Sequence, residues 1–379
     1  MSHDGSYRVY FRCLFLFVLF VASSGASFHG FYSKWHFLEP GTAWYLPKDT
    51  FTAMVDGTAD RPYVYRRLLP AVANWMDGHV SERAKDVLFA IKGPFGKPIL
   101  TFFFDSPLAL NRTYFLRYTI IYVMVSISAF ISVWAMYLAL RVVGQSSVTS
   151  ALAAVTMILL MPYFLTGGGY FYDYPELAFL ALAFLMSFRF AWWWMLPLVV
   201  LATWNKESFL LFIPTLYPIL RVRSSRLSAL IGTTVLCLTC VAVYLVIRVH
   251  FRGNPGSPME FHLLKQIESM FSLSNWFEYD VTYGLLAIRG INLVSAGFVI
   301  GACRYGWGKL PDAVKRHARL AAAINIPFYL LFGYPQEIRT LSLLYPTLLV
   351  LIAVNLTDWI GEQSGEAKGE TIALPGVQV

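Results

Sequence analysis

Long apolar segments, separated by short connections that carry charge, make up most of the 379-residue sequence. Hydrophobic residues form 57% of the chain and charged residues only 14%, whereas about a quarter of a soluble domain is charged. Several apolar segments are long enough to cross a bilayer as helices. The sequence therefore predicts an all-α fold, a polytopic membrane helix bundle that is embedded in the lipid bilayer.

The apolar segments predict about ten transmembrane helices. The first covers residues 1–32, for which a cleaved signal peptide is the alternative, and the other spans lie in a bundle of residues 114–360. These spans are expected near 117–141, 148–165, 175–190, 191–204, 208–221, 227–249, 283–303, 319–333 and 340–359. Several are shorter than the roughly 20 residues of a typical span, which indicates broken or obliquely packed helices.

Two polar segments flank this bundle. Residues 33–113 predict a large external loop, in which the apolar spacing of Val64–Met76 indicates an amphipathic helix at the membrane surface. A second helix is expected over Arg83–Ile91 of the same loop. Residues 361–379 are polar and contain several glycines, so they predict a disordered cytoplasmic tail.

Basic residues in the short connections predict the orientation. With the N-terminus inside, they gather in every second connection, as expected for cytoplasmic loops. The residues concerned are Arg141, Arg189, Arg221, Arg223, Arg226, Arg304, Lys309, Lys315, Arg316 and Arg319. We expect both termini in the cytoplasm and the protein in a bacterial inner (plasma) membrane. The net charge of +8 comes from scattered loop residues, so no nucleic-acid partner is expected.

Lys206 and Glu207 are the most unusual charges, because they stand between two apolar runs with no room for a conventional loop. Inserting an ionisable group into a membrane costs roughly 2.5–3.5 kcal/mol on insertion scales. Residues of this kind are therefore expected to belong to a functional site. Neighbouring residues on a helix point to different sides, and each therefore needs a separate partner. The alternative is a pair of helix-end charges that extend to the interface.

Five charged or aromatic motifs fall on the predicted external face, namely 56–67, 170–176, 205–207, 277–280 and 334–339. A single polar cavity that opens to this face would account for them, although motif 277–280 is the weakest of the five and is interpreted as an exposed loop. The cations suited to a phosphate are Arg66, Arg67, Lys206 and Arg339. A general base or a divalent-cation site could be formed by the carboxylates of the same motifs, which are Asp56, Asp60, Asp173, Glu176, Glu207 and Glu337.

Each of these motifs also has a structural explanation. Arg66 and Arg67 suit an anchor to anionic headgroups, and Glu337 with Arg339 suits a salt bridge within a loop. The sequence shows no zinc-ligand pattern and no phosphate-binding glycine loop, so no metal ligands are assigned. A divalent cation held by the carboxylates is left open as a cofactor.

Together these features resemble the GT-C superfamily, polytopic glycosyltransferases that use polyprenyl-phosphate sugars, and related uncharacterised bacterial membrane proteins. The resemblance rests on the acidic first loop, on Lys206-Glu207 at a span end and on Glu337-Ile338-Arg339 before the last span. The segment 63–70 is also similar to a Tyr-Arg-x-Leu-x-Pro motif of bacterial relatives.

The resemblance implies transfer of a sugar from a polyprenyl-phosphate donor to an acceptor on the external or lumenal face. It implies Asp56 or Asp60 as the catalytic base, with the donor phosphate near Arg66, Arg67 or Arg339. One alternative is a transporter or flippase for an anionic or lipid-linked saccharide, although the internal repeat typical of many transporters is not evident. Another is an oligosaccharide polymerase, which would typically carry its large loop later in the chain.

Overall fold

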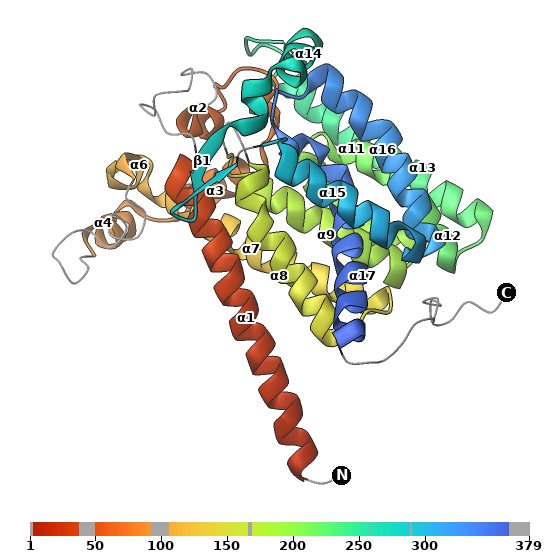
Figure 1. The fold of residues 1–379 in the computed structure, drawn as a ribbon. Helices are drawn as coiled ribbons and strands as arrows, with labels where there is room; N and C mark the ends of the chain where they lie inside the picture. The colour runs from red at the N-terminus through yellow and green to blue at the C-terminus, as the bar shows by residue number, and fades with distance from the viewer. Residues whose placement is uncertain are drawn as a thin grey trace.

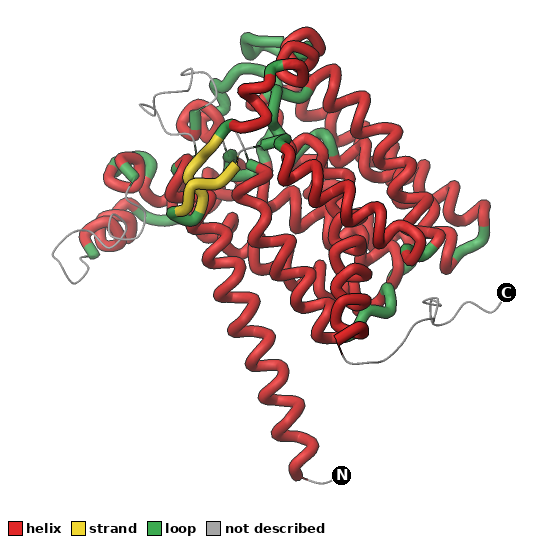
Figure 2. The backbone as a smooth tube through the Cα atoms, in the orientation of Figure 1, coloured by secondary structure: helices red, strands yellow, loops and turns green. Residues whose placement is uncertain are grey.

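A computed structural model describes residues 3–37, 50–91, 106–165, 169–257, 259–288 and 290–363. Helices dominate these residues, and the strands among them form one hairpin (Figures 1 and 2). The predicted all-α architecture is therefore confirmed. Residues 364–379 of the predicted tail lie outside the described residues, as do residues 38–49 and 92–105 of the predicted external loop.

Five helices in the described part of the chain are long and apolar enough to cross a bilayer. They are Val9–Trp35 within α1 (His3–Trp35), α7 (Phe115–Val142), α8 (Ser147–Phe164), α13 (Arg226–His250) and Ile338–Gly361, which contains most of α17 (Tyr345–Gln363). These helices identify an integral membrane protein. The C-terminal half of α1 packs into the bundle, whereas its N-terminal half extends away from it (Figure 1).

Small residues allow the central helices to approach closely. α7 contacts α1, α8 and α9 (Asp173–Arg189). Ala129 and Ala139 of α7 and Ala153 of α8 have no exposed surface. Small side chains are typical where membrane helices pack, because they bring the backbones together. This half of the bundle provides a rigid support for the start of α9.

Prolines divide the second half of the bundle into short helices. The predicted spans 191–204 and 208–221 contain α10 (Leu196–Asn205), α11 (Phe209–Phe212) and α12 (Tyr217–Arg223), with 3₁₀ turns before α10 and α12. Pro197, Pro214 and Pro218 each stand in the first turn of a new segment, where the missing N–H is tolerated. The broken helices predicted here are confirmed.

The predicted span 283–303 is wrong at its start. Residues Tyr279–Thr282 (β1) and Leu285–Ile288 (β2) form an antiparallel hairpin, and α15 (Leu293–Gly306) begins only after Asn292 caps its first turn. Tyr283 and Gly284 both have positive φ, the combination that a tight two-residue hairpin turn requires. The apolar residues of β2 therefore extend the predicted span without belonging to a helix.

The first loop folds into short helices, α2 (Phe51–Asp56), α3 (Leu68–His79), α4 (Glu82–Ala90) and α6 (Pro107–Leu110). The two predicted amphipathic helices correspond to α3 and α4, but α3 starts later than expected. The residue before α3, Arg67, donates a backbone hydrogen bond to the carbonyl of Trp204, at 3.1 Å. This hydrogen bond connects the loop to the end of α10. The helical elements are completed by α14 (Leu263–Phe271) and α16 (Asp312–Phe332).

Candidate functional site

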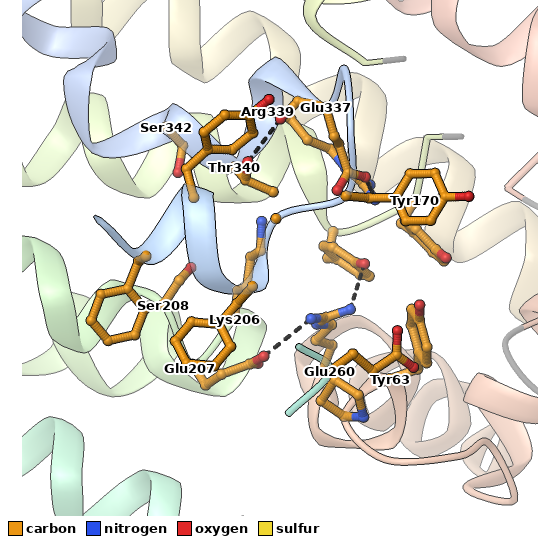
Figure 3. A pocket seen from close by; sticks show the side chains of 18 of the residues that line it. Tyr63, Tyr170, Lys206, Glu207, Ser208, Glu260, Glu337, Arg339, Thr340 and Ser342 are labelled. Atoms are coloured by element: carbon orange, nitrogen blue, oxygen red, sulfur yellow. Dashed lines mark hydrogen bonds and ion pairs between the residues drawn. The ribbon is translucent and has the colours of Figure 1, made fainter. Parts of the chain in front are cut away.

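A cavity of about 1120 Å³ is lined by residues from the end of α1, from β1, from the α10–α11 junction and from the segment before α17 (Figure 3). All five motifs predicted to share one face contribute to its wall. The contributing residues are Tyr63, Tyr65, Arg66, Tyr170, Tyr172, Lys206, Glu207, Tyr279, Asp280, Tyr334, Glu337 and Arg339. The predicted convergence is therefore observed, and it includes motif 277–280, which the sequence favoured as an exposed loop.

A break in the helix separates Lys206 from Glu207. α10 ends at Asn205, and Lys206 has an extended backbone, with φ −157° and ψ 127°. The Lys206 ammonium donates a hydrogen bond to Glu176 Oε2 at 2.6 Å. Glu207 Oε1 instead accepts one from Arg66 Nη2 at 3.1 Å. The two neighbouring charges thus have separate partners, as their adjacency predicted.

Glu176 holds the deepest part of this network. It lies in the first turn of α9 and is 6% exposed. Besides Lys206, it accepts hydrogen bonds at Oε1 from Ser208 Oγ at 3.2 Å and from Ser342 Oγ at 3.0 Å. Three donors from two chain segments, the α10–α11 junction and the turn before α17, therefore satisfy one buried carboxylate, which is not among the residues that line the cavity.

Arg66 lies between aromatic rings on the cavity wall. Its guanidinium is 4.7 Å from the centre of the Tyr172 ring and 5.3 Å from that of Tyr63, and it donates to the Tyr172 hydroxyl at 2.6 Å. Burial works to lower the pKa of Arg66, but the charge of Glu207 and the two tyrosines raise it above its usual value. Arg66 is therefore a buried cation on the cavity wall whose guanidinium is paired with Glu207 and packed against tyrosine rings.

Arg339 joins two carboxylates. It donates to Asp173 Oδ2 at 3.1 Å and pairs with Glu337. Its guanidinium also lies 4.7 Å from the centre of the Tyr170 ring. The predicted loop salt bridge between Glu337 and Arg339 is thus present, and Asp173, only 3% exposed, extends it into the bundle.

Three predicted site residues lie away from the cavity. Arg67 donates to the Met54 carbonyl at the end of α2, and burial lowers its pKa. Asp56 accepts hydrogen bonds from the Tyr114 hydroxyl at 2.6 Å and from Arg117 at 3.1 Å. Asp60 precedes Arg61, whose backbone N–H donates to the loop after α13. None of the three lines the cavity.

Other wall residues were not among the predicted site residues. Lys34 at the end of α1 pairs with Asp280 of the hairpin, and Glu260 pairs with His262 just before α14. A charged residue at the end of a predicted span was the available signal for Lys34. Apolar side chains also line the cavity, among them Leu210, Leu211, Met259, Phe328 and Phe332.

The charges around the cavity are already neutralised. The four wall cations Lys34, Arg66, Lys206 and Arg339 all pair with carboxylates. Several buried polar atoms have no hydrogen-bond partner within the described residues, and in this network they are Tyr65 Oη, Arg66 Nε, Asp173 Oδ1 and Glu207 Oε2. The part of the chain that the structure describes contains no group of three or more His, Cys, Asp or Glu residues arranged to hold a metal ion.

One cavity is therefore lined by charged, aromatic and apolar side chains. Such a cavity suits an amphipathic ligand that carries a polar headgroup. In comparisons with protein families, with curated proteins and with solved structures, nothing matches this chain.

Proposed function

We propose that this protein is an integral membrane glycosyltransferase that transfers a sugar from a polyprenyl-phosphate donor to an acceptor on the external face. The observation that carries the proposal is the cavity itself. Its cations could bind a phosphate, its tyrosine rings could pack against a sugar, and its apolar residues could contact a prenyl chain. A transporter or flippase for the same lipid-linked saccharide would need a similar cavity, so the experiment below separates the two.

The proposed topology has ten crossings. They are α1, α7, α8, α9, α10, the α11–α12 segment, α13, α15, α16 and α17, with both termini in the cytoplasm of a bacterial cell. This arrangement puts the cavity on the external side, where α2, α14 and the hairpin gather. The crossings that are too short to span alone pack against the five long apolar helices.

The donor is proposed to lie along the cavity lining. The prenyl chain follows the apolar residues Leu210, Leu211 and Phe328, and the phosphate and sugar reach the charged and aromatic residues. There the rings of Tyr170 and Tyr172 are stacked, with centres 4.9 Å apart and planes inclined by 11°. Aromatic faces of this kind pack against the C–H groups of a sugar while the neighbouring cations contact the phosphate.

The proposed reaction is a direct displacement. The acceptor oxygen forms a bond to the anomeric carbon, and the bond from that carbon to the phosphate oxygen breaks. The polyprenyl phosphate leaves with the electron pair, and a carboxylate takes the proton of the acceptor hydroxyl. The configuration at the anomeric carbon is inverted in a single displacement.

Glu207 replaces Asp56 and Asp60 as our proposed base. It lies on the cavity wall between the cations Arg66 and Lys206, and its Oε2 has no hydrogen-bond partner among the described residues. Asp56, by contrast, lies outside the cavity and is engaged by Tyr114 and Arg117.

The proposal is tested with purified protein in nanodiscs and a panel of radiolabelled polyprenyl-phosphate sugars. We expect the label to leave the lipid fraction, and Glu207→Gln to slow this step about 100-fold or more. The change conserves shape, and a thermal melt of the variant checks its folding. Asp56→Asn and Asp60→Asn, taken separately, should retain far more activity than Glu207→Gln.

Two results would contradict the proposal at different levels. Wild-type activity in Glu207→Gln, with a loss in Asp56→Asn or Asp60→Asn, would return the role of base to the first loop. Label that stays on the lipid but crosses between leaflets in proteoliposomes would identify a flippase.

A further inference from the structure

The cations of the cavity wall differ in how well their partner carboxylates would stay hydrogen-bonded if the cation moved to a ligand. Arg339 pairs with two carboxylates, and Glu337 has no other side-chain donor within the described network. Arg66 is the partner of Glu207 Oε1, while Glu207 Oε2 has none. Moving either arginine would leave a largely buried carboxylate without compensation, which is strongly destabilising.

Lys206 is different, because its partner keeps other hydrogen bonds. Glu176 accepts from Ser208 Oγ at 3.2 Å and from Ser342 Oγ at 3.0 Å, both at Oε1. The Lys206 ammonium uses only Oε2. If the ammonium moved away, two of the three side-chain donors to Glu176 would stay in place.

The side chain of Lys206 is also suited to movement. A lysine carries a compact charge on a flexible four-carbon stem, whereas the flat guanidinium of an arginine is held by its fork of hydrogen bonds. Figure 3 shows Lys206 extending between Glu207 and Thr340 on the pocket wall. Lys34, the other lysine on the wall, pairs with Asp280, and their side chains are 17% and 29% exposed, so this pair is more solvent-screened than the pair of Lys206 and Glu176.

We propose that Lys206 is the mobile phosphate-binding cation of this cavity. A polyprenyl phosphate draws its ammonium from Glu176 Oε2 to a phosphate oxygen, while Ser208 and Ser342 keep Glu176 hydrogen-bonded. Arg66 and Arg339 remain in their pairs and form the fixed wall of the site. This inference rests on the proposed function only in taking a lipid phosphate as the ligand.

The inference makes Glu176 a competitor of the ligand, and this can be measured. The probe is undecaprenyl phosphate without a sugar, titrated against the full chain in nanodiscs. We expect Lys206→Met to weaken binding about tenfold or more, because a charge-assisted contact is lost. Glu176→Gln should tighten binding several-fold, because it frees Lys206, and the double variant should bind as weakly as Lys206→Met.

Lys309→Met is the matched control. Lys309 also forms a lysine–carboxylate pair, with Asp358 of α17, but it does not line the cavity. This variant should bind as the wild type does, whereas a similar loss would mean that net charge alone governs binding and would overturn the inference.

Other outcomes separate the inference from the proposed function. If Lys206→Met and Glu176→Gln weaken binding equally, and the double variant is no worse than either, the pair is only structural and Lys206 is not the phosphate ligand. Unchanged affinity in Lys206→Met has the same meaning. Wild-type protein that fails to bind the probe would reject the lipid-phosphate ligand itself, and with it both proposals.

Discussion

Two charge networks in this protein use the same residue types in opposite settings. In the cavity, Arg339 pairs with Asp173, and their side chains are 12% and 2% exposed. On the surface of the first loop, Arg112 pairs with Glu82, and their side chains are 37% and 72% exposed. The first pair joins residues 166 positions apart, and the second joins residues 30 positions apart.

Burial of the paired side chains, and not the presence of ion pairs, distinguishes the candidate site from the loop surface. Charges on the loop surface remain hydrated whether or not they are paired, so their pairing contributes little. Charges at the cavity have lost much of their water, so each depends on its protein partner. By the same argument, the phosphate that we propose as the ligand would compete with Glu176 for Lys206.

The largest expected effect comes from Arg339→Met. The change leaves Asp173 and Glu337 without their cation in a place where Asp173 is almost fully buried. We expect the free energy of unfolding to fall by about 3–5 kcal/mol, as for other broken buried pairs. Denaturant unfolding in detergent measures it, with Arg112→Met as the matched surface control. If Arg339→Met lowered the free energy of unfolding no more than Arg112→Met does, the buried ion pairs would contribute no more to stability than the surface ones.

An intermediate effect is expected for the pair of Arg66 and Glu207, whose side chains are 11% and 27% exposed. A double-mutant cycle with Arg66→Met and Glu207→Gln should give a coupling free energy of roughly 0.5–3 kcal/mol. The same unfolding assay provides the four values needed. Additive effects would show that the contact contributes nothing beyond the separate residues.

The smallest effect is expected for Arg112→Met. Hydrogen bonds, first from Lys85 and then from Arg112, lower the pKa of Glu82. A lowered carboxyl pKa stabilises the fold above the usual pKa of Glu, and this contribution disappears as the pH falls through the lowered value. The variant should therefore melt almost as the wild type does at neutral pH, and any difference should vanish in acid or in high salt. A large difference that persists in salt would contradict the proposed contrast.

Much of the fold follows from local patterns. The apolar runs predicted the long helices, and prolines within short runs predicted the broken ones. The basic connections grouped five charged motifs on one face, and these motifs do meet at one cavity. The adjacency of Lys206 and Glu207 was enough to predict that each would need a separate partner.

The pairing itself could not be predicted. It depends on the extended backbone at Lys206 and on contacts between residues more than 100 positions apart, such as Arg66 with Glu207. Asp56 looked like a site residue because nothing local indicated its contacts with Tyr114 and Arg117. The hairpin was missed because the apolar residues of β2 continue directly towards α15, and hydrophobicity alone does not separate a short strand from a helix.

The distance in sequence between Asp173 and Arg339 has a consequence for biogenesis. Chains are synthesised at roughly 5–20 residues per second, so the 166-residue separation makes Arg339 emerge about 8–33 s after Asp173. During this interval Asp173, at the start of α9, has no counter-ion from Arg339. The polar end of the bundle can therefore reach its final form only after α17 has been inserted, and chains truncated before Arg339 should be substrates for membrane quality control.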